Sequence, residues 1–407
     1  MNNPFIILVS PRDNEVKLVQ ELGYRTILLR KEIAFDEVFE VDIPVEIDLN
    51  NETLVLEKCL ELANNHDIAS VFTMNEYRIP LTSKISEVLQ LDYMLPYEAA
   101  NACRNKKLAR KRLNEAGVGP VQYHLVTSQD DVASKVQDSD FPLIVKPSND
   151  SGSKNVYLCK NLQEVSTAVQ NILQGAENIV GQTIDSEVLI EEFLEGPEFS
   201  VESVTVHGRT TIIGITRKVV TPYPLSIEVG HDFPAQLSPH QEKDIEKLVI
   251  ESLKVIGVDF CVTHTEVKLT EKGPKIVEIN ARPGGDEIPE LVKAVNGIDL
   301  KTLAFYVTLG KGIDDLLLSS SSASSASIRF LLANKAGKAL FDENFHSPYI
   351  KKKKWYIQKG DVVPKTESNF NRLGYFIVYG NTETSSFETA NSLQKSLDVT
   401  IQQPLET

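Results

Sequence analysis

The chain has 407 residues, of which 42% are hydrophobic and 24% are charged, and it carries a formal net charge of −15. This composition is that of a globular protein, and the length predicts two to four subdomains. The negative charge argues against non-specific binding of nucleic acid or of an anionic membrane. The four cysteines include no CxxC pair, so we expect reduced thiols in a cytoplasmic protein and no zinc site.

Strand and helix patterns alternate in the first part of the chain. Phe5–Ser10 is an apolar strand pattern, and the residues before it lack the basic region of a signal peptide. Further strand and helix patterns follow at 15–22, 25–30, 54–64 and 70–74. This βαβ order predicts a small open parallel sheet, and we assign residues 1–96 to an N-terminal α/β domain. No apolar run approaches the ~18 residues that a membrane-spanning helix needs.

A basic helical pattern joins this domain to the next part of the chain. Residues 97–117 have a helical pattern, and the sequence GVGP is a clear stop signal, so we assign 97–120 to a helical connection. Residues 121–195 then predict a compact central lobe of α+β type. Its expected strands lie near 122–126, 142–146, 156–159 and 187–193.

After Glu198 the pattern becomes that of antiparallel strands. The expected strands are 198–206, 210–220, 261–270, 275–280, 328–333 and 374–379, with a helix near 239–256. We assign 196–318 to a C-terminal lobe and 319–407 to an extra subdomain. The subdomain begins with a serine-rich stretch at 319–327, which predicts a linker or an exposed loop. The basic run Lys351–Lys354 predicts a solvated loop.

The strongest chemical signal is the sequence KIVEINARPGGD, which ends at Asp286. Alternation along a strand places Ile276, Glu278 and Asn280 on one face. Glu266 lies in the preceding strand, and the turn between the two strands predicts a hairpin that brings it close to Glu278 and Asn280. Two carboxylates and an amide oxygen are hard ligands that suit Mg²⁺. The alternative is a surface hairpin with incidental charges.

Two further segments favour a nucleotide site. An apolar strand ends at Lys146 and leads into a small polar loop that contains Gly152, whose backbone N–H groups can cradle phosphate oxygens. Between Val188 and Glu198 a strand ends in paired acids and apolar residues that suit a flat base, and Glu198 can accept hydrogen bonds from ribose hydroxyls. Taken alone, each segment is also explained by an ordinary turn. Neither a Walker A nor a GxGxxG motif occurs.

The order of these elements resembles that of the ATP-grasp superfamily, across roughly residues 1–310. The resemblance implies that Lys106 and Lys146 contact the phosphates of ATP. It implies that the 149–154 loop, with Ser151, Gly152 and Ser153, is a mobile phosphate lid. Further implied ATP-binding positions are Glu191, Glu192, Phe193, Leu194 and Glu198. Lys218 lies at the end of an expected strand, where it either reaches a phosphate or is exposed. The implied ligands for Mg²⁺, or for Mn²⁺ in its place, are Glu266, Glu278 and Asn280.

Within that superfamily, the segment SIEVGHDFP is similar to the substrate segment of bacterial L-amino-acid ligases, the dipeptide synthetases of the bacilysin-synthetase type. The resemblance implies that Glu228 meets the amino group of an amino acid and that His231 lies beside it. It also implies that Arg282 steadies an acyl phosphate and a tetrahedral intermediate, with backbone N–H groups near Gly284 and Gly285. A polar loop is the alternative for Glu228 and His231.

We therefore expect an ATP-grasp fold with an N-terminal open parallel sheet, a small central lobe, and an antiparallel C-terminal lobe with an extra subdomain. The expected activity joins two L-amino acids into a dipeptide, and a basic first residue such as arginine would suit the acidic chain. One alternative is a ligase for another carboxylate–amine pair, such as a purine precursor. Another is a nucleotide-binding scaffold without turnover, against which the complete set of metal ligands argues. A homodimer stays an alternative to a monomer.

Overall fold

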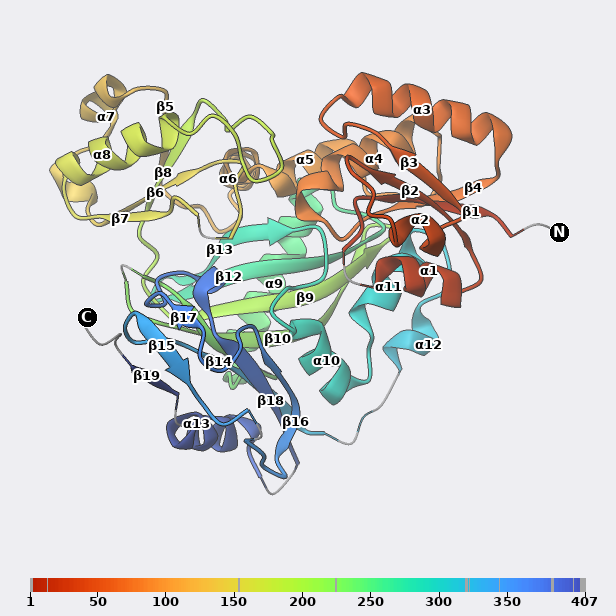
Figure 1. Cartoon of the computed structure of the whole chain (residues 1–407). Helices are drawn as coiled ribbons and strands as arrows, with labels where there is room; N and C mark the ends of the chain where they lie inside the picture. The colour runs from red at the N-terminus through yellow and green to blue at the C-terminus, as the bar shows by residue number, and fades with distance from the viewer. Residues whose placement is uncertain are drawn as a thin grey trace.

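The computed structural model describes residues 3–12, 14–152, 154–223, 225–318, 321, 323–343, 345–381, 384–397 and 399–402. Ser153, one of the residues of the expected phosphate lid, lies outside these ranges. Two lobes sit above one large sheet, and the last part of the chain packs at the opposite end of that sheet (Figure 1). Within the described ranges, every helix is too short or too polar to cross a membrane.

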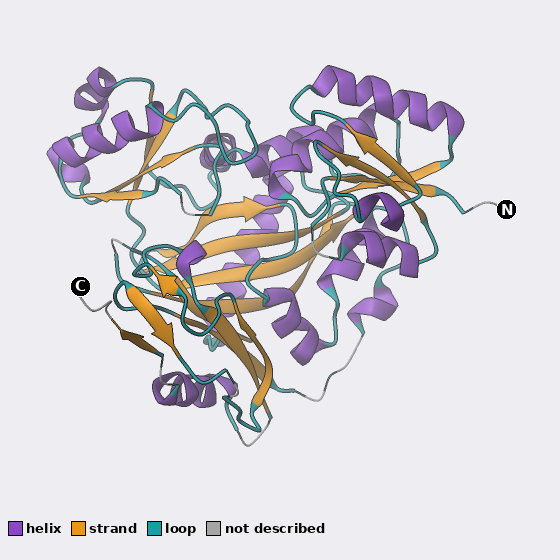
Figure 2. Cartoon of the chain, viewed as in Figure 1, coloured by secondary structure: helices purple, strands orange, loops and turns teal. Residues whose placement is uncertain are grey.

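The N-terminal domain contains the expected open parallel sheet, with strand order β3-β2-β1-β4. All five residues of the central strand β1 are buried, because helices cover both faces of the sheet (Figure 2). The elements are β1 (Phe5–Val9), α1 (Glu15–Glu21), β2 (Arg25–Arg30), α2 (Glu37–Glu40), β3 (Ile43–Glu46), α3 (Glu52–Asn65), β4 (Ile68–Phe72), η1 (Glu76–Arg78) and α4 (Ile79–Val88).

The helical connection expected over 97–117 consists of two helices, α5 (Tyr97–Arg104) and α6 (Lys106–Glu115). Asn105 has an extended backbone between them, and its side chain accepts a hydrogen bond from the N–H of Lys107. An asparagine that caps a new helix in this way satisfies an otherwise unpaired backbone donor. The break places Lys106 at the first position of α6.

The central lobe is a four-stranded antiparallel sheet with strand order β5-β8-β6-β7, packed against two helices. Its strands are β5 (Tyr123–Val126), β6 (Leu143–Pro147), β7 (Tyr157–Cys159) and β8 (Val188–Glu192), and its helices are α7 (Gln129–Lys135) and α8 (Leu162–Leu173). The apolar face of α8 packs onto the sheet and gives the lobe a core of its own. The expected strands of this lobe all occur.

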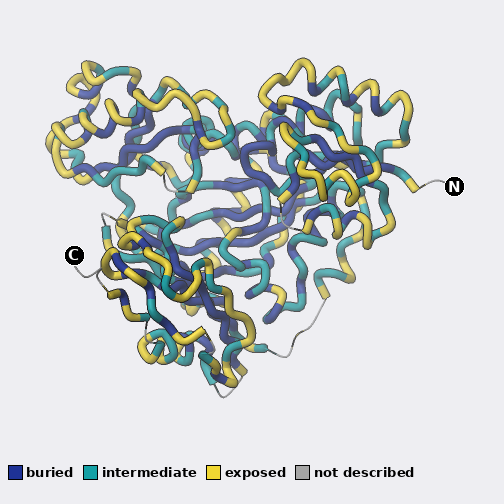
Figure 3. Tube along the Cα trace, in the orientation of Figure 1, coloured by how far each residue is buried: buried dark blue, intermediate teal, exposed yellow. Residues whose placement is uncertain are grey.

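The large sheet has eight strands in the order β13-β12-β9-β10-β11-β14-β18-β16. Its first five strands are β9 (Glu198–Val206), β10 (Arg209–Val220), β11 (Glu228–Phe233), β12 (Cys261–Thr270) and β13 (Gly273–Asn280). Helix α9 (Pro239–Ile256) packs with α5 and α6 on one face, while α10 (Ile288–Asn296) and α11 (Leu300–Val307) pack on the other. The strands between these layers are largely buried (Figure 3).

The C-terminal segment, residues 325–402, adds three strands to this same sheet: β14 (Ser325–Leu331), β18 (Gly374–Gly380) and β16 (Ile350–Trp355). Strand β14 begins inside the serine-rich stretch, and β16 contains the four lysines of the basic run, so the expected solvated loop is wrong there. An edge strand exposes one side to water, where lysines discourage further pairing. A separate small sheet, β15 (Gly337–Leu340), β17 (Val362–Val363) and β19 (Thr400–Gln402), and helix α13 (Ser386–Ser396) complete the segment.

Candidate active site

A pocket lies between the central lobe and the large sheet, and most of the expected site residues line it. Those residues are Lys106, Lys146, Ser151, Gly152, Glu191, Glu192, Phe193, Leu194, Glu198, Lys218, Glu228, Glu266 and Glu278. They come from α6, the central lobe and five strands of the large sheet. The fold therefore brings together side chains that are up to 172 positions apart in the sequence.

The hairpin of β12 and β13 forms as expected and sets Glu266 directly opposite Glu278. His264 lies opposite Asn280 in the same pairing. The strict alternation predicted for β13 is wrong, because the pairing shifts by one residue at Val277 and produces a bulge. As a result Ile276 packs in the core, while Glu278 faces the pocket.

Lys218 is the most heavily paired cation of the pocket. Its Nζ atom lies 2.7 Å from Glu198, 3.0 Å from Glu228 and 2.9 Å from Glu266, and only 3% of its side chain is exposed. Burial by itself lowers the pKa of Lys218, but the three carboxylates outweigh it and raise that pKa well above the usual range. Lys218 therefore stays protonated and links three strands of the sheet.

Two other lysines approach the pocket from the side of the central lobe. The Nζ atom of Lys106 donates to the backbone oxygen of Asp150 at 2.8 Å and lies 3.2 Å from Glu278. Lys146 lies 2.5 Å from Glu191, whose other carboxylate oxygen accepts from Arg110 at 2.5 Å.

Glu191 is ionised in this arrangement. Burial raises its pKa, but the charges of Arg110 and Lys146 dominate and lower it to about 2. The carboxylate of Glu191 therefore holds Lys146 beside the expected phosphate loop. The apolar wall nearby is formed by Phe193, whose ring packs edge-on against Tyr223 at 5.1 Å between centroids.

The expected phosphate loop is attached to the N-terminal domain. The hydroxyl of Ser151 donates to that of Tyr77 at 2.6 Å, and Tyr77 donates to Asp150 at 3.3 Å. Arg104 donates to the backbone oxygen of Asn149 at 2.5 Å. The Tyr77 contacts join the two upper lobes beside the pocket, and Arg104 joins the loop to α5. Sequence patterns carry no signal for Tyr77 or Arg104.

Arg282 lies beside the pocket rather than in its lining. Its Nη2 atom is 2.6 Å from Glu76 of η1, and Arg104 is 3.7 Å from the other oxygen of the same carboxylate. Glu76 was not expected at the site, because nothing in its local sequence distinguishes it. Arg282 also lines a second cavity, between the N-terminal domain and the large sheet, whose walls are mostly apolar.

The loop after β13 packs closely against a buried His–Glu pair. His264 Nδ1 and Glu202 Oε1 are 2.5 Å apart, and the N–H of Gly284 donates to the other oxygen of Glu202 at 3.1 Å. Burial lowers the pKa of His264, but Glu202 and Glu266 outweigh it and raise it to about 9. Glu202 thus anchors both His264 and the backbone of Gly284.

We expect Gly284→Ala to destabilise the protein by about 1–3 kcal/mol, the range typical of overpacking. A Cβ atom there would lie 2.8 Å from His264 and 2.9 Å from Glu202, which leaves no room for a methyl group. Gly285→Ala is the matched control, because a Cβ atom at Gly285 meets no atom within 4 Å. Thermal unfolding of both variants compares them directly, and equal melting temperatures would contradict this account.

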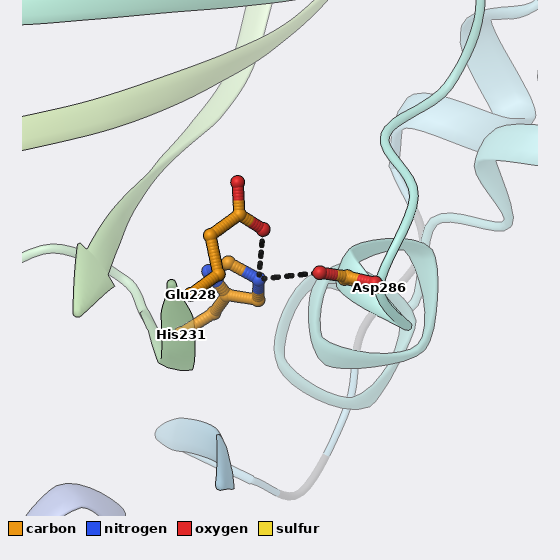
Figure 4. Close-up of side chains that lie close together, drawn as sticks. All are labelled: Glu228, His231 and Asp286. Carbon is orange, nitrogen blue, oxygen red and sulfur yellow. Dashed lines mark ion pairs between the residues drawn. The ribbon is translucent and has the colours of Figure 1, made fainter. Parts of the chain in front are cut away.

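Glu228, His231 and Asp286 form a cluster at the end of β11 (Figure 4). His231 Nε2 lies 3.6 Å from Glu228 Oε2 and 3.6 Å from Asp286 Oδ2. Arg372 of the C-terminal segment pairs with both oxygens of Asp286 at 2.7 Å. The contributions of Asp286 and Arg372 were not expected from the sequence.

The residues around Glu266 and Glu278 fit a hard divalent cation. Both carboxylates face the pocket, lie on neighbouring strands, and already contact the ammonium groups of Lys218 and Lys106. Asn280 is buried two positions further along β13. Carboxylate and amide oxygens are the ligands that Mg²⁺ takes in proteins.

Comparison with known proteins agrees with this arrangement. Residues 139–290 match the ATP-grasp domain family. Dapdiamide A synthase of Enterobacter agglomerans is 23% identical over 313 residues, which cover 73% of this chain and 72% of that protein. The alanine–anticapsin ligase of Bacillus subtilis (strain 168) is 28% identical over 280 residues, which cover 65% of this chain and 59% of that protein.

The crystal structure of an L-amino acid ligase from Bacillus licheniformis superimposes with a TM-score of 0.82 at 20% identity, covering 99% of this chain and 100% of the other. This agreement includes the C-terminal segment as well as the lobes around the pocket. Residues 139–290 therefore match the ATP-grasp domain family, and the chain has the ATP-grasp fold.

Proposed function

We propose that the protein is an ATP-dependent ligase that joins the carboxylate of one L-amino acid to the amine of another. The observation that carries this proposal is one pocket lined by two lysines on the side of the central lobe, by the paired carboxylates of β12 and β13, and by Glu228, behind which His231 is buried. The similarity to alanine–anticapsin ligase and to dapdiamide A synthase supports the same substrate class.

In the proposed reaction, a carboxylate oxygen of the first amino acid attacks the γ-phosphorus of ATP. A new O–P bond forms, the bond between the γ-phosphorus and the bridging oxygen breaks, and ADP leaves. The amine of the second amino acid then attacks the carbonyl carbon of the acyl phosphate. A C–N bond forms, the C–O bond to phosphate breaks, and the amine loses a proton, which yields a dipeptide and phosphate.

Each step develops negative charge, and the lysines and Arg282 are the groups that would offset it. Lys106 and Lys146 would contact the phosphates of ATP, with the 149–154 loop closing over them. Glu266, Glu278 and Asn280 would hold Mg²⁺, which neutralises phosphate charge when it is bound. Arg282 would release Glu76 and turn toward the acyl phosphate and the oxyanion.

Glu228 would bind the ammonium group of the first amino acid. Its carboxylate lies at the wall of the pocket, and only one of its oxygens contacts Lys218. The pKa of Glu228 is raised, and burial is the main cause. Lys218 and His231 lower this pKa, while Asp286 raises it further. A bound cation would favour the ionised form of such a carboxylate.

The deciding experiment measures phosphate release from Mg-ATP with single and paired L-amino acids, and identifies the products by mass spectrometry. We expect release that depends on a pair and a product with the mass of the dipeptide. Release that needs a different carboxylate or amine would redirect the assignment to another ATP-grasp ligase reaction. ATP binding without turnover in any combination would favour a scaffold instead.

A further inference from the structure

His231 is a buried polar side chain that points into the space between two carboxylates. Its side chain is 0% exposed, and neither ring nitrogen has a hydrogen-bond partner within the part of the chain that the structure describes. The 3.6 Å from Nε2 to each neighbouring oxygen is too long for a direct hydrogen bond. Figure 4 shows Nε2 facing both Glu228 and Asp286. The three acceptor atoms lie within 4.8 Å of one another.

Asp286 is held in this position by the C-terminal segment. Both nitrogens at the end of Arg372 pair with its two oxygens at 2.7 Å, which is the bidentate geometry of a strong ion pair. Arg372 itself stacks on Phe330 with its Cζ atom 3.7 Å from the ring centroid. It also donates to the backbone oxygen of Asn369 at 2.8 Å, and the side chain of Asn369 accepts from the N–H of Glu228 at 2.9 Å. One short loop therefore contacts both acids of the cluster.

Contacts from the C-terminal segment also fix the backbone around Asp286. Asp286 and Glu287 have φ values of 51° and 61°, in the left-handed region that residues other than glycine seldom adopt. Tyr375 donates to one oxygen of Glu287 at 2.7 Å, and Lys352 contacts the other at 2.8 Å. Such a backbone persists where the surroundings determine it. Strands β16 and β18 thus keep Asp286 turned toward His231.

The charges around the cluster favour a monovalent cation over a metal ion. Lys218 already contacts Glu228, and Arg372 already contacts Asp286. A divalent ion would add two more positive charges beside these cations. A primary ammonium group adds one charge, and it carries three N–H donors, which match two carboxylate oxygens and an imidazole nitrogen.

We propose that Asp286 is a third acceptor, with Glu228 and His231, for the ammonium group of the substrate, and that Arg372 is the residue that positions it. This inference rests on the proposed function, because that function supplies a substrate with an ammonium group. It gives the C-terminal segment a role in substrate binding. Arg372 acts through Asp286 and does not itself contact the substrate.

The test is isothermal titration calorimetry on the full chain with Mg²⁺ and a non-hydrolysable ATP analogue. The titrants are the common L-amino acids and, for each one that binds, the carboxylic acid that lacks the α-amino group. We expect Asp286→Asn to weaken binding of the amino acid about 10- to 100-fold, as the loss of a charged hydrogen bond does. Binding of the acid without the amine, and of the ATP analogue, should change little.

Variants of Arg372 test whether this residue positions Asp286. We expect Arg372→Gln to weaken amino-acid binding by a similar factor, and Arg372→Lys to recover part of it, because lysine keeps the charge but not the bidentate geometry. Arg209→Gln is the matched control, because Arg209 is exposed at the start of β10. Near-wild-type affinity in both Asp286→Asn and Arg372→Gln would overturn the inference.

Three other outcomes are also decisive. The inference is wrong if no amino acid binds the wild-type chain, if the variants weaken binding of both titrants equally, or if Mn²⁺ alone binds in a manner that depends on Asp286.

Dipeptide formation is assayed on the same samples. Amino-acid binding that depends on Asp286 without dipeptide formation would sink the proposed function and leave this inference standing. Dipeptide formation that the variants do not affect would overturn this inference alone.

Discussion

Lys218→Met is expected to lower the free energy of unfolding by about 3–5 kcal/mol, the usual effect of removing one partner from a buried ionic cluster. Methionine has a similar length but no charge, so Glu198, Glu228 and Glu266 would face one another with far less neutralisation. The three strands that carry them would then repel one another at the floor of the pocket. Urea unfolding followed by circular dichroism measures the change.

Lys247→Met is the matched control for this substitution. Lys247 lies on α9 with 71% of its side chain exposed, 3.9 Å from Glu251. Exposed pairs of this kind contribute little to stability, so we expect a change within about 0.5 kcal/mol. If Lys218→Met lowered the free energy of unfolding no more than Lys247→Met does, the carboxylates would be neutralised by other means. Lys218 would then not be the centre of the cluster.

Arg282→Ala is expected to lower kcat for phosphate release by about 10²- to 10³-fold, the typical cost of losing a group that stabilises a developing oxyanion. The expectation follows from the proposed role of Arg282 at the acyl phosphate, beside the glycines of the loop after β13. The affinity for ATP should change little, because the nucleotide phosphates would be held by Lys106 and Lys146. Steady-state kinetics together with ATP binding separates the two quantities.

The double variant Arg282→Ala with Glu76→Gln tests whether the loss of activity comes indirectly from the unpaired carboxylate of Glu76. Arg282 lies 2.6 Å from Glu76, so Arg282→Ala also leaves a largely buried carboxylate without its main partner. If the loss of activity came from that carboxylate, Glu76→Gln would restore turnover in the Arg282→Ala background. We expect the double variant to stay as slow as Arg282→Ala. Full turnover in Arg282→Ala with normal ATP binding would show that Arg282 has no part in the reaction.

The sequence predicted those parts of the molecule that depend on local patterns. Sequence patterns located all four strands of the central lobe and most strands of the other two parts, but they gave no strand at β3 or β11. The short turn after Thr270 implied the hairpin that sets Glu266 opposite Glu278. Where a local pattern was ambiguous, the prediction failed. The lysines of β16 read as a loop because an edge strand with one exposed side has little apolar periodicity.

The contacts that were missed are long-range. Arg282 and Glu76 are 206 positions apart, and Arg372 and Asp286 are 86 apart. Each pair is brought together by tertiary packing, which no spacing or propensity encodes in a single sequence. The bulge at Val277 was missed for a related reason, since it depends on how β12 and β13 are paired.

The continuous eight-stranded sheet has a consequence for the order in which the chain folds. Strand β11, which carries Glu228 and His231, pairs with β14, and β14 in turn pairs with β18 at Gly374–Gly380. Pairings that are distant along the chain form late, because the connecting segments must first be ordered. A chain that ended before residue 325 would therefore leave β11 at the edge of the sheet, and one that ended before residue 372 would lack the partner of Asp286. Such a nascent chain would have both upper lobes and the hairpin of β12 and β13, yet it would lack the contacts through which the C-terminal segment holds Asp286.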